Sequence, residues 1–283
     1  MFSWDLILDI VLDALLDTLK LLPFLFAAYL LMEAAEHRLS EKMEARLQSM
    51  GKLGPLVGAL LGCVPQCGFS SAASNFYAAG LISRGTLLAV FLSTSDEAVP
   101  LMIGSPEGRR MIPLLLLSKV TVGIAAGFAV DLILRKRGSQ RQLFDLCENC
   151  GCDEESGILH PALWHTGHIL LFIFGINLLL NGAIELLGQE RIASILLSGS
   201  ALQPFAAALV GLIPNCAASV TLTQLFLAGS LSFGACLAGL CSNAGLGLAV
   251  LLRMNRSKRE NLQIVVTLYL VSALFGLALQ LLL

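Results

Sequence analysis

Long apolar runs separated by short polar segments make up most of this chain. Six of the runs approach or exceed the length that an α-helix needs to cross a lipid bilayer, about 20 residues. Four further apolar pieces are shorter and come in two adjacent pairs. This pattern predicts an all-α polytopic membrane protein. The long runs are 21–37, 85–104, 111–134, 165–187, 233–252 and 262–283, and the short pieces are 53–64, 66–82, 200–213 and 215–230.

Each pair of short pieces meets at a proline, Pro65 in the first half of the chain and Pro214 in the second. Proline keeps the preceding residue out of helical geometry and removes a helical hydrogen bond, so each pair should be a broken helix. The sequence around the two prolines also recurs at a constant offset of 149 residues. We therefore predict two copies of one unit, each with a proline-broken helical hairpin. The matched pairs include Pro55 and Pro204, Gly62 and Gly211, Cys67 and Cys216, Ser70 and Ser219, Gly85 and Gly234, and Ser93 and Ser242.

The first twenty residues follow a different pattern, in which Asp5, Asp9, Asp13 and Asp17 recur along one stripe of a helix. This favours an amphipathic helix in the membrane interface, with a spanning helix that has one wet face as the alternative. Acidic residues at this position also argue against a signal peptide. The predicted organisation is an amphipathic helix (1–20), a first transmembrane repeat (21–134), a linker (135–162) and a second transmembrane repeat (163–283).

The basic residues predict which loops share one side of the membrane. If each pair of short pieces returns to the side where it starts, 13 of the 16 loop Lys and Arg residues lie on the side of Arg84 and loops 38–52, 135–141 and 253–259. If each pair is a single kinked crossing, the division is 11 to 5. The first arrangement is favoured. It makes the two units, of about five helical segments each, inverted repeats in a bacterial inner membrane, with the linker in the cytoplasm and both termini outside.

Composition excludes several classes of protein. Hydrophobic residues make up 56% of the chain and charged residues 13%, whereas an average soluble domain is about a quarter charged. A net charge of −2 without a basic patch gives no indication of nucleic-acid binding. The chain also has no nucleotide-binding P-loop. We therefore expect no cofactor, and an ion or proton gradient as the source of energy.

A cysteine follows each of the two prolines, Cys67 after Pro65 and Cys216 after Pro214. The unpaired N–H groups at the start of a helix favour a reactive thiol, and thiolates are ligands for soft metals and metalloids. Packing of a small side chain is the alternative for each cysteine alone. Their equivalent positions in the two units favour a shared substrate site. The expected substrate-binding residues are Cys67, Cys216, Gln66, Asn215, Ser70, Ser219 and Asn243.

Two adjacent carboxylates, Asp96 and Glu97, lie in the middle of the apolar run 85–104. Charged groups inside a membrane are costly and typically mark an ion or proton pathway, so we expect Asp96 and Glu97 to couple transport to a gradient. A turn outside the membrane is the alternative. Lys119, in the next run, is the expected counter-charge.

The linker contains Cys147, Cys150 and Cys152, followed along the chain by His160, His165 and His168. Closely spaced thiols suit a tetrahedral soft metal or a trivalent metalloid, which predicts a cytoplasmic metal-capture site. A redox Cys-x-x-Cys motif and a chance cluster are the alternatives.

Several of these segments resemble one family, the ten-helix heavy-metal or arsenic efflux permeases. They are 64–70 (Val-Pro-Gln-Cys-Gly-Phe-Ser), 94–100 (Thr-Ser-Asp-Glu-Ala-Val-Pro), 213–216 (Ile-Pro-Asn-Cys) and the cysteine-rich linker. The resemblance covers nearly the whole chain and implies export of a metal or metalloid. Some members of the family are labelled manganese transporters. The residues to which it points are Pro65, Cys67, Asp96, Glu97, Pro214 and Cys216.

Three functions therefore stay open. The favoured one is a permease that exports an arsenite-like or thiophilic species, working in the bilayer as a single chain or a homo-oligomer. The second is a carrier of manganese or another hard cation, with oxygen ligands. The third is a membrane thiol oxidoreductase that uses Cys63 with Cys67 and Cys147 with Cys150.

Overall fold

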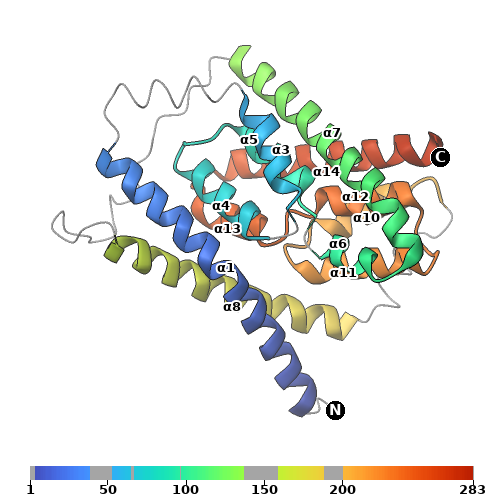
Figure 1. Ribbon diagram of the computed structural model, residues 1–283, viewed down its shortest axis with the longest axis horizontal. Coiled ribbons are helices and arrows are strands. Elements are labelled where there is room, and N and C mark those ends of the chain that lie inside the picture. Colours follow the sequence, from blue (N-terminus) through green and yellow to red (C-terminus); the bar gives the residue numbers. More distant parts are fainter. Residues whose placement is uncertain are drawn as a thin grey trace.

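The computed structural model describes residues 4–38, 53–64, 67–95, 97–136, 159–187 and 200–282, and their regular structure is helical throughout. Two long helices lie on one side, two more on the other, and the short helices gather between them (Figure 1). The helices are α1 (Trp4–Arg38), α3 (Gly54–Gly62), α4 (Cys67–Ala78), α5 (Arg84–Ser93), α6 (Ala98–Ile103), α7 (Pro106–Lys136), α8 (Leu159–Leu187), α10 (Gln203–Gly211), α11 (Cys216–Leu227), α12 (Phe233–Ser242), α13 (Leu246–Met254) and α14 (Lys258–Leu282).

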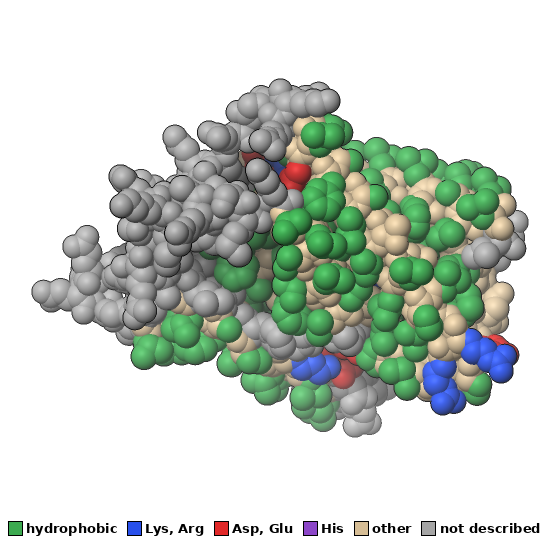
Figure 2. All heavy atoms as spheres, turned by 45° about the horizontal axis from the view of Figure 1, so that its top comes forward, with side chains coloured by type: hydrophobic (Ala, Val, Ile, Leu, Met, Phe, Trp, Pro, Cys, Tyr) green, Lys and Arg blue, Asp and Glu red, His purple; other side chains and the backbone are tan. Residues whose placement is uncertain are grey.

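Five stretches of the described residues are long and apolar enough to cross a membrane, which confirms the prediction of an all-α polytopic membrane protein. Hydrophobic side chains spread over the face drawn in Figure 2, with a few charged groups near its edges. The surface of a soluble protein rarely exposes so large an apolar area. The stretches are Arg84–Ile103, Pro106–Leu134, Ala162–Leu179, Phe233–Met254 and Lys258–Leu282.

Two of these stretches are interrupted in the middle, whereas the sequence predicted continuous runs at 85–104 and 233–252. In the first, α5 ends at Ser93 and α6 begins at Ala98; in the second, α12 ends at Ser242 and α13 begins at Leu246. Gly245, the residue just before α13, has a φ of 53°, a conformation that residues with a side chain rarely adopt. Both interruptions leave backbone groups without helical partners deep in the molecule.

The N-terminal helix α1 passes without a break through Pro23 and through the boundary predicted after residue 20. Its buried positions, including Ala14, Leu21 and Leu25, form one stripe, and α1 packs against α8. Leucines on other faces of the same helix, such as Leu16 and Leu19, are exposed. The interfacial position of residues 1–20 stays a prediction.

Three helices of the first half have counterparts in the second half at the same offset as the repeated sequence. The bounds of α3, α4 and α5 differ from those of α10, α11 and α12 by 149 residues at both ends. In each half the third helix packs between the first and a long helix: α5 between α3 and α7, and α12 between α10 and α14.

Helices of the two halves also pack against each other. Helix α4 of the first half packs against α13 of the second, while α11 of the second packs against α6 of the first. The contact between α4 and α13 is tight, because a Cβ on Gly247 would collide with Ser70, and Ser74 Oγ donates to the carbonyl of Gly247 at 2.7 Å. The interrupted helices are therefore held by the opposite half of the chain.

Candidate functional site

The second proline break brings Cys216 to the start of a buried helix. Asn215 caps α11 by accepting a hydrogen bond from the Ala217 N–H at 3.1 Å, and its side chain is 1% exposed. Asparagine is a favoured capping residue because its side-chain oxygen pairs with an N–H that has no helical partner. Cys216 is buried in an apolar cluster with Leu21 of α1 and Leu246 of α13. A single thiol thus lies where α11 meets helices from both ends of the chain.

The same break contacts the interruption between α12 and α13. The Asn243 Nδ2 atom donates to the carbonyl of Asn215 at 3.4 Å, and the Asn243 Oδ1 atom accepts from the Gly245 N–H at 2.7 Å. Asn243 is 2% exposed. Asn243 therefore supplies hydrogen-bond partners to backbone groups at two helix breaks. Buried backbone groups need such partners when the helix does not provide them. The sequence predicted Asn215 and Asn243 at one site, and the structure brings them into contact.

Glu97 belongs to the interruption between α5 and α6 and forms an ion pair that the sequence did not predict. Lys20 Nζ of α1 lies 3.8 Å from Glu97 Oε1 and 3.2 Å from Asp17 Oδ1. Cys216 lies in one hydrophobic cluster with Leu21, the residue next to Lys20. Glu97 and Cys216, from opposite halves of the chain, therefore both approach the turn of α1 that holds Lys20 and Leu21. The predicted pairing of Lys119 with Asp96 lies outside the described residues, because Asp96 does.

Lys119 is fully buried on α7. Its Nζ atom donates to the carbonyl of Leu240 at 2.5 Å. This carbonyl is in the last turn of α12, where carbonyl groups have no helical partner and the helix dipole favours a cation. The buried amino group of Lys119 thus joins α7 to the end of α12.

One face of α4 carries buried polar groups without partners. Ser71 and Asn75 lie one helical turn apart, on the face that begins with Cys67. Among the described residues, Ser71 Oγ and Asn75 Nδ2 have no hydrogen-bond partner, although Tyr29 Oη donates to Asn75 Oδ1 at 3.1 Å. Leaving such a group unpaired costs about 1–3 kcal/mol. A bound ligand or water would remove this cost.

The other predicted serines lie at helix contacts. Ser70 faces Gly247 of α13, and Ser219 Oγ donates to the carbonyl of Cys216 at 2.7 Å within α11. His168 is exposed at the surface of α8, where its ring lies 4.6 Å from that of Trp164. Their roles in binding stay predictions. The side chains of Gln66, Cys67, Asp96, Cys147, Cys150, Cys152, His160 and His165 lie outside the described residues.

Within the described part of the chain, no three His, Cys, Asp or Glu side chains lie close enough to hold a metal ion together. Cys63, Cys216, Cys236 and Cys241 are free thiols, and no three of these four come together.

Sequence reasoning singled out neither Lys20 nor Tyr29 as part of the site. Lys20 is the one basic residue before His37 and directly follows the stripe of aspartates, which was an available signal. For Tyr29 no local signal existed, since its partner Asn75 is distant in the sequence.

The chain was compared with known proteins and families. The model of the ArsP_2 family, described as "Putative, 10TM heavy-metal exporter", matches residues 3–174, more than half of the chain. Comparison with curated proteins and with solved structures returned no significant match.

Proposed function

Because the chain belongs to the ArsP_2 family of 10TM heavy-metal exporters, we propose that it exports a thiophilic metal or metalloid species through a site between its interrupted helices. The observation that carries the proposal is that Glu97 pairs with Lys20 while Cys216 packs with the adjacent Leu21, so that both halves of the chain meet at one turn of α1. A thiol from one half and a carboxylate from the other supply a soft ligand and an ionisable group at one place.

Cys67, the equivalent of Cys216, is the second proposed ligand. It begins α4, whose unpaired polar atoms on Ser71 and Asn75 continue the same helical face. Backbone and side-chain groups at broken helices are typical substrate ligands in secondary transporters. Gln66, Asn215, Ser70, Ser219 and Asn243 complete the proposed lining of the path.

The proposed architecture is a pair of inverted units, each with a proline-broken hairpin, that expose the site alternately to the two sides. Two contacts support the inversion. Asp131, near the end of α7, accepts a hydrogen bond from Ser83 Oγ at 2.6 Å. Glu260, near the start of α14, forms an ion pair at 3.4 Å with Arg84, the residue after Ser83. The C-terminal end of α7 and the N-terminal end of its equivalent, α14, therefore lie together at the start of α5. Inverted units require such an antiparallel arrangement.

Asp96 and Glu97 are proposed to carry the coupled proton or ion. Cys147, Cys150 and Cys152 would capture substrate in the cytoplasm, and a bacterial inner membrane is the proposed location. A hard-cation carrier, the second candidate, is supported by the amide side chains of Asn215 and Asn243 at the breaks, because carbonyl oxygens suit Mn²⁺.

The experiment that tests the function is a transport panel in inside-out membrane vesicles. Vesicles with and without the protein are given arsenite, antimonite, Zn²⁺, Cd²⁺ or Mn²⁺ under a proton gradient. The proposal predicts accumulation of a thiophilic species, whereas accumulation of Mn²⁺ alone would favour the hard-cation carrier. If no member of the panel enters the vesicles, the export proposal is wrong.

A further inference from the structure

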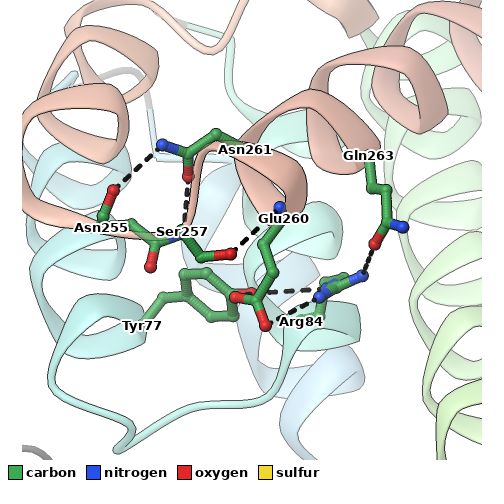
Figure 3. A network of polar contacts seen from close by, with 7 residues as sticks. All are labelled: Tyr77, Arg84, Asn255, Ser257, Glu260, Asn261 and Gln263. Carbon is green, nitrogen blue, oxygen red and sulfur yellow. Dashed lines mark hydrogen bonds and ion pairs between the residues drawn. The ribbon is translucent and has the colours of Figure 1, made fainter.

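A polar network joins the two halves of the chain at one end of the molecule (Figure 3). Arg84, which begins α5, donates from Nη1 to Gln263 Oε1 at 2.8 Å and forms an ion pair with Glu260 Oε1 at 3.4 Å. Tyr77, near the end of α4, donates to Glu260 Oε2 at 3.2 Å and accepts from Arg84 Nε at 3.3 Å. The network therefore ties two helices of the first half to the start of α14.

The segment that carries Glu260 is itself held in shape. Asn255 Nδ2 donates to Asn261 Oδ1 at 2.6 Å, and Asn261 Nδ2 donates to the carbonyl of Asn255 at 3.1 Å. The Glu260 N–H donates to Ser257 Oγ at 3.4 Å. These bonds hold the corner between α13 and α14 (Figure 3). We therefore expect a displacement of α13 to move Glu260 as well.

The equivalent positions in the opposite half are apolar. An offset of 149 residues takes Tyr77 to Phe226 and Arg84 to Phe233, whose rings contact each other edge to face at 6.0 Å. The counterparts of Glu260, Asn261 and Gln263 are Met111, Ile112 and Leu114. Phe226, Phe233 and Ile112 pack against the same hydrophobic core. The positions that form the polar network thus have apolar counterparts in the repeated sequence.

This asymmetry has a physical consequence for a molecule that alternates between two states. Parting an apolar contact exposes hydrocarbon, whereas a partly exposed ion pair exchanges its partner for water at little cost. The side chains of Arg84 and Glu260 are 14% and 29% exposed, so water already reaches the pair. The polar contact is therefore suited to opening and closing repeatedly.

The network is also connected to the proposed site at both of its helices. Helix α4 runs from Cys67 to the Tyr77 end, and α13 runs from the interruption at Gly245 to the corner that carries Glu260. The two helices pack tightly along Ser74 and Gly247. A shift of this pair at the site would therefore move both sides of the network.

We propose that Tyr77, Arg84, Glu260 and Gln263 form a latch that closes the path on the side of loop 253–259 and opens once in each transport cycle. This inference rests on the proposed function, because the path that the latch closes is the proposed route of the substrate. By the distribution of basic residues this side is the cytoplasm, so the latch controls entry of substrate to Cys216 from the cell interior.

The test measures how fast Cys216 reacts with a membrane-impermeant thiol reagent added on the side of loop 253–259, in a full-length chain whose other cysteines are replaced by serine. Glu260→Gln keeps the size of the side chain and removes its charge. We expect the labelling rate to rise about two- to fivefold, the range that a partly exposed ion pair contributes. The exchanged pair Arg84→Glu with Glu260→Arg should return the rate toward that of the parent, which separates a latch from a general loss of folding.

Equal labelling of the parent, Glu260→Gln and the exchanged pair would overturn the latch, as would failure of the exchanged pair to lower the rate. Flux of arsenite and Cd²⁺ is measured in the same vesicles on the protein with its native cysteines. If the labelling rate of Cys216 changes as expected but neither arsenite nor Cd²⁺ is transported, the proposed function is contradicted and the latch is supported. If transport is normal but the labelling rate does not change, the latch is contradicted and the proposed function is supported.

Discussion

Gly211 of α10 lies against Ser242 of α12 so closely that a Cβ on the glycine would collide with the serine hydroxyl and with the carbonyl of Gly239. The first half repeats this contact between Gly62 and Ser93, with the carbonyl of Val90 in the corresponding place. Ser83 and Asp131 recur in the same way as Ser232 and Gln280, a pair joined at 3.1 Å. Duplicated sequence thus corresponds to duplicated close packing.

Substitution of Gly211 by alanine should therefore lower stability. Because the Cβ would meet backbone as well as a side chain, we expect a loss of about 1–3 kcal/mol in the free energy of unfolding, the usual cost of overpacking. Gly175→Ala is the matched control, since no described residue lies within 4 Å of its Cβ position, and alanine should stabilise α8 there by about 0.5–1 kcal/mol. Thermal unfolding in detergent measures both, and equal midpoints for the two variants would contradict the close contact.

The unpaired hydroxyl of Ser71 gives a second prediction. Ser71→Ala removes a buried group that has no partner in the described part of the chain, so stability should stay level or rise, while flux should fall if the hydroxyl contacts the substrate. Ser74→Ala, three residues further along α4, is the control, because its hydroxyl contacts α13. It loses bonds to the carbonyls of Ser70 and Gly247 and should cost about 1 kcal/mol of stability without a change in the apparent affinity for substrate. If both variants change flux in proportion to their stability, Ser71 has no contact with substrate.

Lys119 provides a third prediction, because its equivalent in the second half is the fully buried Leu268. Lys119→Leu takes the donor away from the Leu240 carbonyl, at a cost of about 1–3 kcal/mol, but it also removes the cost of burying the polar amino group. We therefore expect Lys119→Leu to fold with a thermal midpoint close to the parent's and to lose transport, since the bond to the end of α12 is removed. Normal flux in a folded Lys119→Leu protein would show that this amino group has no part in transport.

The sequence predicted the features that depend on neighbouring residues or on exact repetition. Pro214 and the capping Asn215 mark the start of α11 locally, and identical residues at one offset revealed the duplication. The interruption at Asn243–Gly245 was missed because hydropathy averaged over a window does not report a glycine with positive φ. The pair between Lys20 and Glu97 was missed because it depends on how α1 packs, which no local pattern contains.

The distribution of basic residues leads to a fourth prediction, on the orientation of the chain in the membrane. Cys147, Cys150 and Cys152 should stay unlabelled when intact cells are treated with an impermeant thiol reagent, and should react after the cells are opened. The orientation follows from the excess of Lys and Arg on the side of the linker. Ready labelling of these cysteines in intact cells would mean that the proposed arrangement of the two units is wrong.

The central claim is that Cys67 and Cys216 are the ligands of a thiophilic substrate. Serine keeps nearly the size of cysteine and its hydrogen bonding but is not a soft ligand, so the double variant Cys67→Ser with Cys216→Ser isolates this property. Cys236→Ser is the control, because Cys236 is a thiol of α12 that is buried in the hydrophobic core. Asp96→Asn, measured alongside, should stop gradient-driven movement and leave binding detectable.

The decisive measurement is the initial rate of gradient-driven arsenite or Cd²⁺ uptake into vesicles that contain the double variant. The account predicts a loss of about tenfold or more, the scale of effects at metal ligands and their supporting groups, with Cys236→Ser close to the parent. Near-normal uptake by the double variant would contradict it, and loss of binding in Asp96→Asn would then point to a hard cation held by oxygen ligands.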